Sequence, residues 1–246
     1  MPKKPHSPRS TKVTPAQATP TGGGRGRTDE GPAIESSELR IIGGSLRGRK
    51  VAYTGDARTR PMKDRVREAL FNLLGPSVKG SHVLDLFAGT GALGIEALSR
   101  GANRATFFEK HFPTAEVLGK SLSELGLLER GEVIAGDTFL QVRRMRRDGP
   151  CFAVVEPWVV FCSPPYDFYV DRRDEVLKVL DDLLAQAPLR SILIVEADRR
   201  FDFEQLPNPD QWRVREYNPA VVGIYRTGTP GEKVSGRLET DDPGEG

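Results

Sequence analysis

The stretch "HVLDLFAGTGALGIEALS", from His82 to Ser99, decides the fold. Its apolar opening predicts a buried strand over 82–87, and the pattern from Gly91 to Ser99 predicts a helix. Gly89, Gly91 and Gly94 lie around the junction in the spacing G-x-G-x-x-G. Three glycines within six positions at such a junction favour a ligand-binding loop, although tight turns alone also use glycine.

Strand and helix patterns alternate on the C-terminal side of this stretch. Repeated strand–helix units with nearly continuous apolar strands predict a mostly parallel α/β sheet that is covered on both faces. With 82–87 the strands number seven, and the last two form an antiparallel hairpin around Asn218–Pro219. The further strands are expected at 104–109, 132–137, 158–162, 191–197, 211–218 and 220–227, and the helices at 112–125, 138–147 and 170–186.

The segments outside this core divide into three parts. Residues 1–36 are rich in Pro, Gly, Thr and basic residues, and residues 228–246 form an acidic segment. Neither segment has enough apolar surface to offset the entropy of ordering it, so we expect two disordered tails. Residues 37–80 predict a basic segment with strands at 39–42 and 49–51 around Gly43–Gly44 and a helix at 63–74. The core then covers 81–227.

The net charge of +2 conceals a regional excess of basic residues. Between Arg40 and Lys79 only Asp56, Asp64 and Glu68 oppose ten basic residues. An excess of this kind is typical of surfaces that contact nucleic-acid phosphates, and the alternative is an ordinary solvated surface. The ten are Arg40, Arg47, Arg49, Lys50, Arg58, Arg60, Lys63, Arg65, Arg67 and Lys79.

Composition excludes several classes of protein. No stretch approaches the roughly 20 apolar residues of a membrane helix, and the mean hydropathy is −0.42. The N-terminus has no apolar core of a secretory signal. Cys151 and Cys162 lie in or near apolar runs and read as buried free thiols, which favours a cytoplasmic protein. His6, His82 and His111 form no cluster, so we expect no metal site. We also expect a monomer.

The glycine loop has two readings that differ in the ligand. Glu109 lies twenty residues after Gly89 at the end of the next strand, which matches a dinucleotide fingerprint with the carboxylate on ribose hydroxyls. Asp85 favours a different ligand, because its carboxylate would repel a pyrophosphate but attract the α-ammonium group of S-adenosylmethionine. Asp137 ends the following strand and could accept a hydrogen bond from an adenine amine. The plainer alternative is that Asp85 and Asp137 only cap helices or turns.

The stretch "FCSPPYDFY", Phe161–Tyr169, leaves a buried strand through two prolines. Prolines carry no N–H, so the carbonyls beside them are not consumed by a regular ladder. The Pro164 carbonyl and the Ser163 side chain could grip the two hydrogens of an exocyclic base amine, while Tyr166 stacks on the base. This grip would free the nitrogen lone pair for attack on a methyl sulfonium. The alternatives are a simple strand terminator and a half-buried core ring.

Several blocks together resemble one family. These are "RIIGGSLRGRK" (Arg40–Lys50), "TRPMKDRVREALFNLLG" (Thr59–Gly75), "VLDLFAGTGALGIEALSRGA" (Val83–Ala102), "FFEK", "GD" and the "PPY" corner, in this order. Over residues 39–227 the chain resembles the bacterial RsmD-type methyltransferases, which modify the exocyclic amine of a guanine in small-subunit ribosomal RNA. The resemblance implies a Rossmann-like methyltransferase fold, S-adenosylmethionine as cofactor, and ribosomal RNA or the small ribosomal subunit as partner.

The resemblance also implies roles for individual residues. Asp85, Phe87, Gly89 and Gly91 would surround the methionine part of the cofactor, Glu109 would bind the ribose, and Asp137 would lie near adenine. Ala88, Lys110 and Thr138 complete the expected cofactor-binding set. The expected catalytic residues are Ser163, Pro164 and Tyr166, and the expected RNA-binding residues are Arg47, Arg49, Lys50, Arg60 and Arg65.

Ser163 departs from the family pattern, in which the corner begins with Asp or Asn. A neutral hydroxyl is a weaker acceptor than a carboxylate, whose hydrogen bonds are about twice as strong. Three outcomes are open: the Pro164 carbonyl carries most of the effect, Asp167 or Glu156 replaces the lost carboxylate, or the chain is an RNA-binding protein without activity. We expect reduced or compensated activity. A nicotinamide-dependent oxidoreductase remains a third hypothesis, which rests on the glycine spacing alone.

Overall fold

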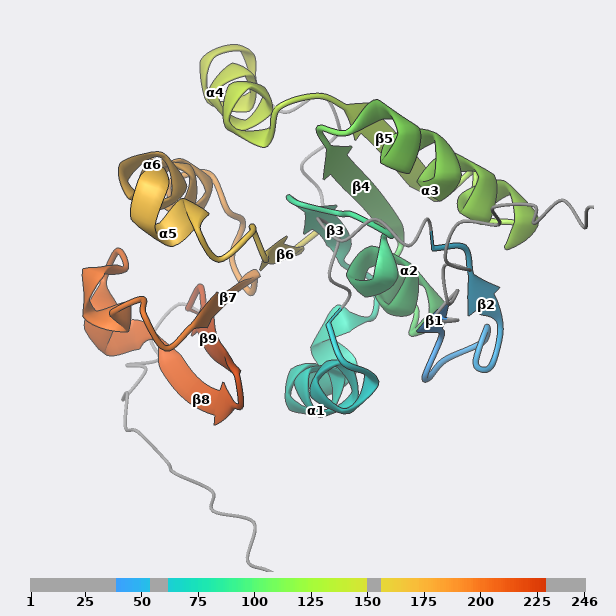
Figure 1. Ribbon diagram of the computed structural model, residues 1–246, viewed down its shortest axis with the longest axis horizontal. Helices are drawn as coiled ribbons and strands as arrows, with labels where there is room; N and C mark the ends of the chain where they lie inside the picture. The colour runs from blue at the N-terminus through green and yellow to red at the C-terminus, as the bar shows by residue number, and fades with distance from the viewer. Residues whose placement is uncertain (1–38, 54–61, 150–155, 229–246) are drawn as a thin grey trace, which may run out of the picture. The chain divides into compact units, whose positions relative to one another are not determined.

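The computed structural model describes residues 39–53, 62–149 and 156–228. The expected N-terminal tail, nearly all of the expected C-terminal tail, Arg60 and Cys151 lie outside the described residues. The described residues form a seven-stranded sheet covered by helices and a separate two-stranded ribbon (Figure 1). In these ranges no helix is both long and apolar enough to cross a membrane.

The sheet has the strand order β5-β4-β3-β6-β7-β9-β8, which places β3 between two parallel neighbours. The order reverses there, because the chain builds β3, β4 and β5 in one direction and β6 and β7 in the other. The mostly parallel sheet and the antiparallel hairpin are therefore confirmed. The bounds are β3 His82–Asp85, β4 Arg104–Glu109, β5 Gly131–Ala135, β6 Trp158–Cys162, β7 Ile192–Asp198, β8 Arg213–Tyr217 and β9 Ala220–Arg226.

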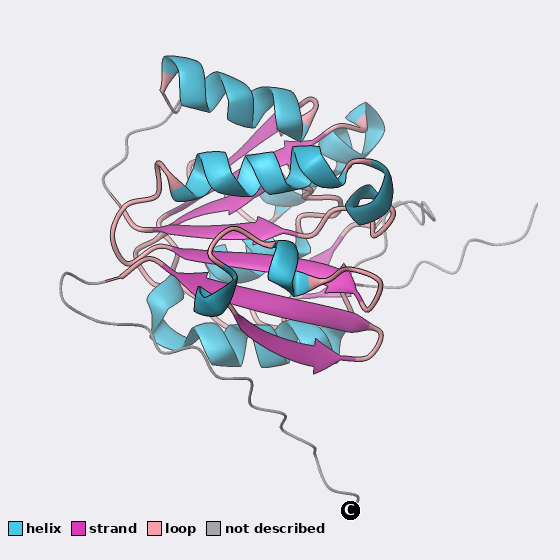
Figure 2. Cartoon of the chain, turned by 90° about the vertical axis from the view of Figure 1, so that its left-hand side faces the viewer, coloured by secondary structure: helices cyan, strands magenta, loops and turns pink. Residues whose placement is uncertain are grey.

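Helices cover both faces of the sheet (Figure 2). Successive residues of β4 show the division, because side chains of a strand alternate between its faces. Phe107 belongs to an apolar cluster that includes residues of α1, α2 and α3, and Phe108 to a second cluster that includes residues of α4, α5 and α6. Burying one such ring contributes about 1.5–3 kcal/mol. The bounds are α1 Asp64–Leu74, α2 Ala92–Ser99, α3 Phe112–Glu124, α4 Thr138–Asp148, α5 Phe168–Asp171 and α6 Arg173–Leu184, with 3₁₀ turns at Gly75–Val78, Phe203–Gln205 and Pro209–Gln211.

The single long helix expected over 170–186 is wrong, because the structure has two helices that meet at Arg172. The backbone of Arg172 leaves the helical region (φ −132°, ψ 25°). Its guanidinium lies 4.1 Å from the ring centre of Phe139 and donates to the Glu175 carboxylate at 2.8 Å. These contacts favour a break that apolar periodicity cannot reveal, since residues on both sides keep a helical pattern.

The expected N-terminal strands form a short antiparallel ribbon, β1 (Leu39–Arg40) with β2 (Lys50–Val51). Glu96 of α2 holds this ribbon to the core, because its buried carboxylate accepts hydrogen bonds from the backbone N–H groups of Ile42 (2.7 Å) and Gly43 (2.8 Å). The Ser99 hydroxyl accepts a further bond from the Leu46 N–H at 2.9 Å. The glycines after β1 therefore dock the ribbon as well as turning the chain.

Arg67 does not belong to the exposed basic surface that the charge count predicts. Its side chain is 1% exposed and donates to the Asp64 carboxylate at 3.0 Å and to the backbone carbonyl of Arg40. It also lies 4.0 Å from the Glu96 carboxylate. Arg67 thus connects α1 to β1 and α2 and does not contribute to the exposed basic excess.

Candidate active site

The carboxyl ends of β3, β4 and β6 meet at one edge of the sheet. Asp85 is aligned with Phe107 of β4 and with Phe161 of β6. The glycine loop after β3, Glu109 at the end of β4 and the proline corner after β6 therefore lie beside one another. Ligands of open α/β sheets bind at this edge where the strand order reverses, which here is between β3 and β6.

Two of the loop glycines are required by packing. Gly91 has φ of 76°, a left-handed conformation, and a Cβ added to it would lie 2.3 Å from Leu118 of α3. A Cβ on Gly94 would lie 2.2 Å from the ring of Phe107. The second and third glycines of the spacing thus let α2 approach α3 and β4, respectively, and the loop ahead of them is free to serve a ligand.

Asp85 is a buried carboxyl directly beneath the glycine loop. It is 2% exposed and its Oδ2 accepts from the Gly94 N–H at 3.1 Å. Burial raises the pKa of Asp85 to about 7, an effect that the Gly94 hydrogen bond opposes and the charge of Glu109 reinforces. A cation would relieve this cost, whereas an anionic pyrophosphate would increase it. The pair of carboxyls therefore fits the α-ammonium and ribose of S-adenosylmethionine better than a nicotinamide dinucleotide.

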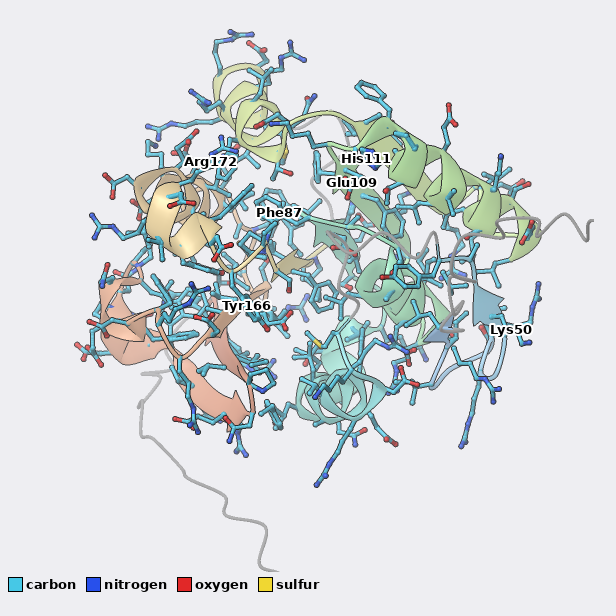
Figure 3. The ribbon with its side chains drawn as sticks, in the orientation of Figure 1. Lys50, Phe87, Glu109, His111, Tyr166 and Arg172 are labelled. Atoms are coloured by element: carbon cyan, nitrogen blue, oxygen red, sulfur yellow. The ribbon has the colours of Figure 1, made fainter. Side chains whose placement is uncertain are left out.

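Glu109 closes the loop from the neighbouring strand. Its Oε2 accepts from the Gly89 N–H at 2.8 Å, and its Oε1 accepts from the His111 N–H at 2.7 Å. Both bonds fix the carboxylate, and each oxygen keeps a second lone pair for a ligand hydroxyl. Phe87, Glu109 and His111 lie near one another in Figure 3, while Lys50 lies apart on β2.

Asp137 has the capping role that the plainer alternative describes. Its Oδ1 accepts from the N–H groups of Phe139 (3.0 Å) and Leu140 (3.3 Å) at the start of α4. Its Oδ2 pairs with Lys110 at 3.1 Å. Burial raises the pKa of Asp137, but the Lys110 and Leu140 hydrogen bonds outweigh it and hold the pKa below its usual range. Thr138 is buried and its hydroxyl donates to the Leu86 carbonyl.

An aromatic cluster beside the loop was not predicted as a unit. The ring of Phe87 lies 5.7 Å from that of Phe139 and 6.1 Å from that of Phe168, measured between ring centres. Arg172 stacks over Phe139 and, at 5.1 Å, over Phe168. Phe87 lies in the glycine-loop block and Phe168 in the stretch Phe161–Tyr169, but neither was expected to pack with Phe139. Phe139 and Phe168 lie in the first turns of α4 and α5, at the same edge of the sheet. A search that includes the first helical turn after each strand would have found them.

The proline corner follows β6, the strand that pairs with β3. No N–H within the described residues donates to the Pro164 carbonyl, whereas the Pro165 carbonyl accepts from Phe168 at 2.9 Å. The Ser163 hydroxyl oxygen is buried and makes no hydrogen bond of standard geometry with the described residues. The Tyr166 hydroxyl donates to Oε1 of Glu196 at 3.0 Å. This bond fixes the position of the Tyr166 ring, which sequence reasoning expected to stack on a base.

Neither carboxylate proposed to replace the missing one lies in the corner. Asp167 is 75% exposed and pairs with Arg200 at 3.0 Å. Glu156 precedes β6, at the opposite end of that strand, and accepts from Asn103 at 3.4 Å. The carboxylate that does lie there is Glu196, near the end of β7. Sequence reasoning missed it because Glu196 ends an otherwise apolar run and reads as an ordinary strand residue.

The described RNA-binding candidates lie on the ribbon and on α1. Arg47, Lys50 and Arg65 are exposed, and the guanidinium of exposed Arg49 donates to the Glu124 carbonyl at 2.8 Å.

Cys162 of β6 is fully buried and free, and burial raises the pKa of its thiol to about 12. It is therefore a core residue and not a nucleophile.

Comparisons with known proteins agree with this arrangement. The family model described as conserved hypothetical protein 95 matches residues 39–226. A protein named ribosomal RNA small subunit methyltransferase D, from Haemophilus influenzae, is 32% identical over 189 residues, which cover 77% of this chain and 92% of the relative.

Solved structures also match. The Escherichia coli protein yhhF superimposes with a TM-score of 0.63 and 27% identity, covering 78% of this chain and 99% of that one. A Salinibacter ruber RNA methyltransferase, solved in complex with S-adenosyl-L-homocysteine, shares the fold with a TM-score of 0.50 and 18% identity, covering 73% and 99% of the two chains. The sheet is thus that of the Rossmann-like methyltransferases. The family model covers most of the chain, and the chain therefore belongs to the RsmD-type family.

Proposed function

We propose that the protein transfers a methyl group from S-adenosylmethionine to the exocyclic amine, N2, of a guanine in small-subunit ribosomal RNA. The observation that carries this proposal is the pairing of β3 with β6, which puts the glycine loop and the proline corner side by side. A donor held by the loop would face an amine held by the corner. The name of the Haemophilus influenzae relative, a ribosomal RNA small subunit methyltransferase, supports ribosomal RNA as the substrate.

The residues around the loop fit the cofactor. Asp85 would bind the α-ammonium group, and Glu109, fixed by the N–H groups of Gly89 and His111, would accept the ribose hydroxyls. Phe87 and Phe139 would form an apolar wall beside them. When bound, S-adenosylmethionine supplies an electrophilic methyl group on a positively charged sulfur.

The chain itself positions and activates the amine. The lone pair of an exocyclic amine is delocalised into the base, so the amine is a poor nucleophile. The unoccupied Pro164 carbonyl and the Ser163 hydroxyl oxygen would accept its two hydrogens and draw the nitrogen toward tetrahedral geometry. Tyr166 would bound the base. Holding the nitrogen in line with the methyl group converts an intermolecular reaction into an oriented one, which is a large share of the rate gain.

The ribbon and α1 supply the contacts with RNA backbone. Arg47, Lys50 and Arg65 are exposed there, and phosphate contacts of this type set the register of a nucleic acid without reading its sequence. A paired guanine would have to leave its stack to reach the corner. Binding of this kind weakens as salt increases, because bound counterions are no longer released.

Methyl transfer to small ribosomal subunits tests the proposal. Subunits that lack the modification would be incubated with protein and labelled S-adenosylmethionine, and the labelled nucleoside would be identified after digestion. N2-methylguanosine from the parent, and about 100-fold less from Tyr166→Ala, is the expected result. Label on adenine or cytosine would refute the guanine assignment. Bound cofactor without any transfer would favour an RNA-binding protein without activity, and binding of NAD would favour an oxidoreductase.

A further inference from the structure

Glu196 is a buried carboxylate at the corner to which the proposed mechanism gives no role. It is 8% exposed, and its Oε1 accepts the hydrogen bond from the Tyr166 hydroxyl. Its backbone carbonyl accepts another from the Tyr169 hydroxyl at 3.0 Å. Within the described residues no Lys or Arg pairs with its carboxylate. Burying a carboxylate without a cationic partner costs free energy of folding. If position 196 only had to fill space, an apolar residue there would make the protein more stable.

Strand geometry brings Glu196 to Ser163. β6 and β7 are parallel, and Cys162 is aligned with Val195. The next residues are Ser163, directly after β6, and Glu196 of β7, so the two follow aligned positions on neighbouring strands. Side chains alternate, and both residues share the face of Phe161 and Ile194, two positions earlier. The Ser163 hydroxyl makes no hydrogen bond of standard geometry to any described residue, yet it is close enough to stabilise the charged Glu196.

We propose that Glu196 is the final acceptor of the proton released when the amine is methylated, and that the Ser163 hydroxyl relays this proton. The inference rests on the proposed function. It assigns to Ser163 the contact with the substrate and to Glu196 a supporting position behind it. Tyr166 holds Glu196 in place through the carboxylate oxygen that it contacts.

The relay balances in atoms and charge. The amine nitrogen forms a bond to the methyl carbon, and the carbon–sulfur bond breaks with its electron pair passing to sulfur. The nitrogen then carries a positive charge and one proton too many. This proton passes to Oγ of Ser163 while the Ser163 hydroxyl proton passes to the Glu196 carboxylate. The products are a neutral methylated amine, a neutral thioether and a protonated Glu196, which returns its proton to solvent.

The surroundings of Glu196 suit a proton acceptor. Burial raises its pKa above the usual range, and the hydroxyls of Tyr166 and Ser163 partly oppose this effect. The Tyr169 hydroxyl of α5, which contacts the Glu196 backbone carbonyl, is neutral because burial raises its pKa. An acceptor with a raised pKa takes up a proton more readily than an exposed carboxylate, and general bases of this kind contribute about 10²- to 10⁴-fold to rates.

A double-mutant cycle with single-turnover rates tests the relay. Glu196→Gln keeps the size of the side chain and an oxygen for Tyr166, and it should slow methyl transfer about 100-fold. Ser163→Asp places a carboxylate where it can take the proton directly. Glu196→Gln should then cost less than about threefold in the Ser163→Asp background. Equal losses in both backgrounds would overturn the relay. Glu216→Gln, an exposed change on β8, is the matched control.

The pH profile separates proton transfer from mere support of the fold. At saturating S-adenosylmethionine the parent rate should rise with pH and level off once Glu196 is ionised. Glu196→Gln should lose that rise. If the rise persists in the variant, another group accepts the proton and the proposal is wrong.

A readout without turnover distinguishes failure of the relay from failure of the proposed function. Infrared titration of the protein with S-adenosyl-L-homocysteine should show a carboxyl band that disappears in Glu196→Gln. Its midpoint should move to higher pH in Ser163→Ala, because the hydroxyl lowers the pKa of Glu196. An unchanged midpoint would exclude the Ser163–Glu196 contact even in an active enzyme. If Ser163→Ala shifts the midpoint but the parent transfers no methyl group, the Ser163–Glu196 contact exists and the proposed function is wrong. The relay, which rests on that function, is then refuted as well.

Discussion

The backbone N–H of Gly89 donates to the Glu109 carboxylate across 2.8 Å, so the loop after β3 is tied to the end of β4. The other oxygen of Glu109 holds the N–H of His111. One side chain therefore organises, through contacts within the chain itself, both segments that would surround the cofactor. Preorganisation of this kind lowers the entropy that binding must overcome.

Glu109→Ala should weaken binding of S-adenosylmethionine by about 10- to 150-fold. Hydrogen bonds to a charged group contribute about 1.5–3 kcal/mol, and the substitution also leaves the Gly89 N–H without its acceptor. Titration calorimetry measures the change directly. Glu116→Ala, exposed on α3, should bind as the parent does. Affinity within twofold of the parent for Glu109→Ala would mean that this carboxylate does not contact the cofactor.

Binding of S-adenosylmethionine should weaken as pH falls below about 7. Burial raises the pKa of Asp85 to about 7, so below this pH the carboxyl must lose a proton before it can pair with the α-ammonium group. The association constant should fall by up to about tenfold per pH unit below that point and stay level above it. Asp85→Asn should bind weakly at every pH, and exposed Asp181→Asn should keep the parent profile. A flat parent profile would contradict the assignment of Asp85.

Without ligand, Asp85 and His82 should affect stability in opposite directions. Native Asp85 keeps its proton up to about pH 7, whereas the unfolded carboxyl releases it near 3.8, so the unfolding free energy falls as pH rises through this window, by on the order of 4 kcal/mol. Burial lowers the pKa of His82 to about 4, so the unfolding free energy falls as pH drops from 6.5 to 4.

Urea unfolding between pH 4.5 and 7.5 separates the two effects, which partly cancel in the parent. Asp85→Asn should leave a stability that rises with pH up to about 6.5, and His82→Gln should leave one that falls. Parallel curves for the parent and both variants would show that neither group titrates differently in the native and unfolded states.

Gly94→Ala should destabilise the protein by about 1–3 kcal/mol, because the new methyl group would lie 2.2 Å from the Phe107 ring and the core is already closely packed. Gly119→Ala in α3 is the matched comparison, since an added Cβ there meets no atom within 4 Å. Alanine favours a helix by up to about 1 kcal/mol over glycine, so this variant should be more stable. Shifts of the same sign in the urea midpoint would be inconsistent with this packing argument.

Arg47→Ala and Arg65→Ala should each weaken RNA binding and reduce its salt dependence. Each lost phosphate contact should lower the slope of log K against log salt by about 0.7–0.9. Filter binding at several salt concentrations gives both quantities. Arg199→Ala removes a guanidinium that pairs with Glu216 at 2.5 Å and is the charge-matched control. If all three variants lose the same slope, binding depends on net charge and not on the ribbon and α1.

The strands of the sheet were predictable because their physical signal is local. Most of the central strands are apolar runs, so β6 matches the expected range 158–162 and β4 that of 104–109. Convergence of the loop, Glu109 and the corner followed from parallel topology alone. The helix break at Arg172 did not, because it depends on a stacking contact with Phe139, which is distant in sequence.

The errors at the site have a common cause. Arg67 looked exposed because it follows apolar Val66 by one helical step, and only the packing of β1 and α2 against α1 shows that it is covered. Glu196 looked structural because its neighbours in sequence are apolar, and only the β6–β7 register places it behind Ser163. Asp137 caps α4, as its position before a helical pattern indicates, whereas its contact with adenine remains a prediction.

Glu96 lies on the helix that begins at the glycine loop, and it also anchors the ribbon through Ile42 and Gly43. The ribbon and the loop are thus joined through a single rigid element and should open as one cooperative unit. In an enzyme built in this way, the order of the loop that would bind the methyl donor is coupled to the order of the ribbon proposed to bind the nucleic acid. Whatever orders the start of α2 should also steady the ribbon, the surface proposed to contact phosphates.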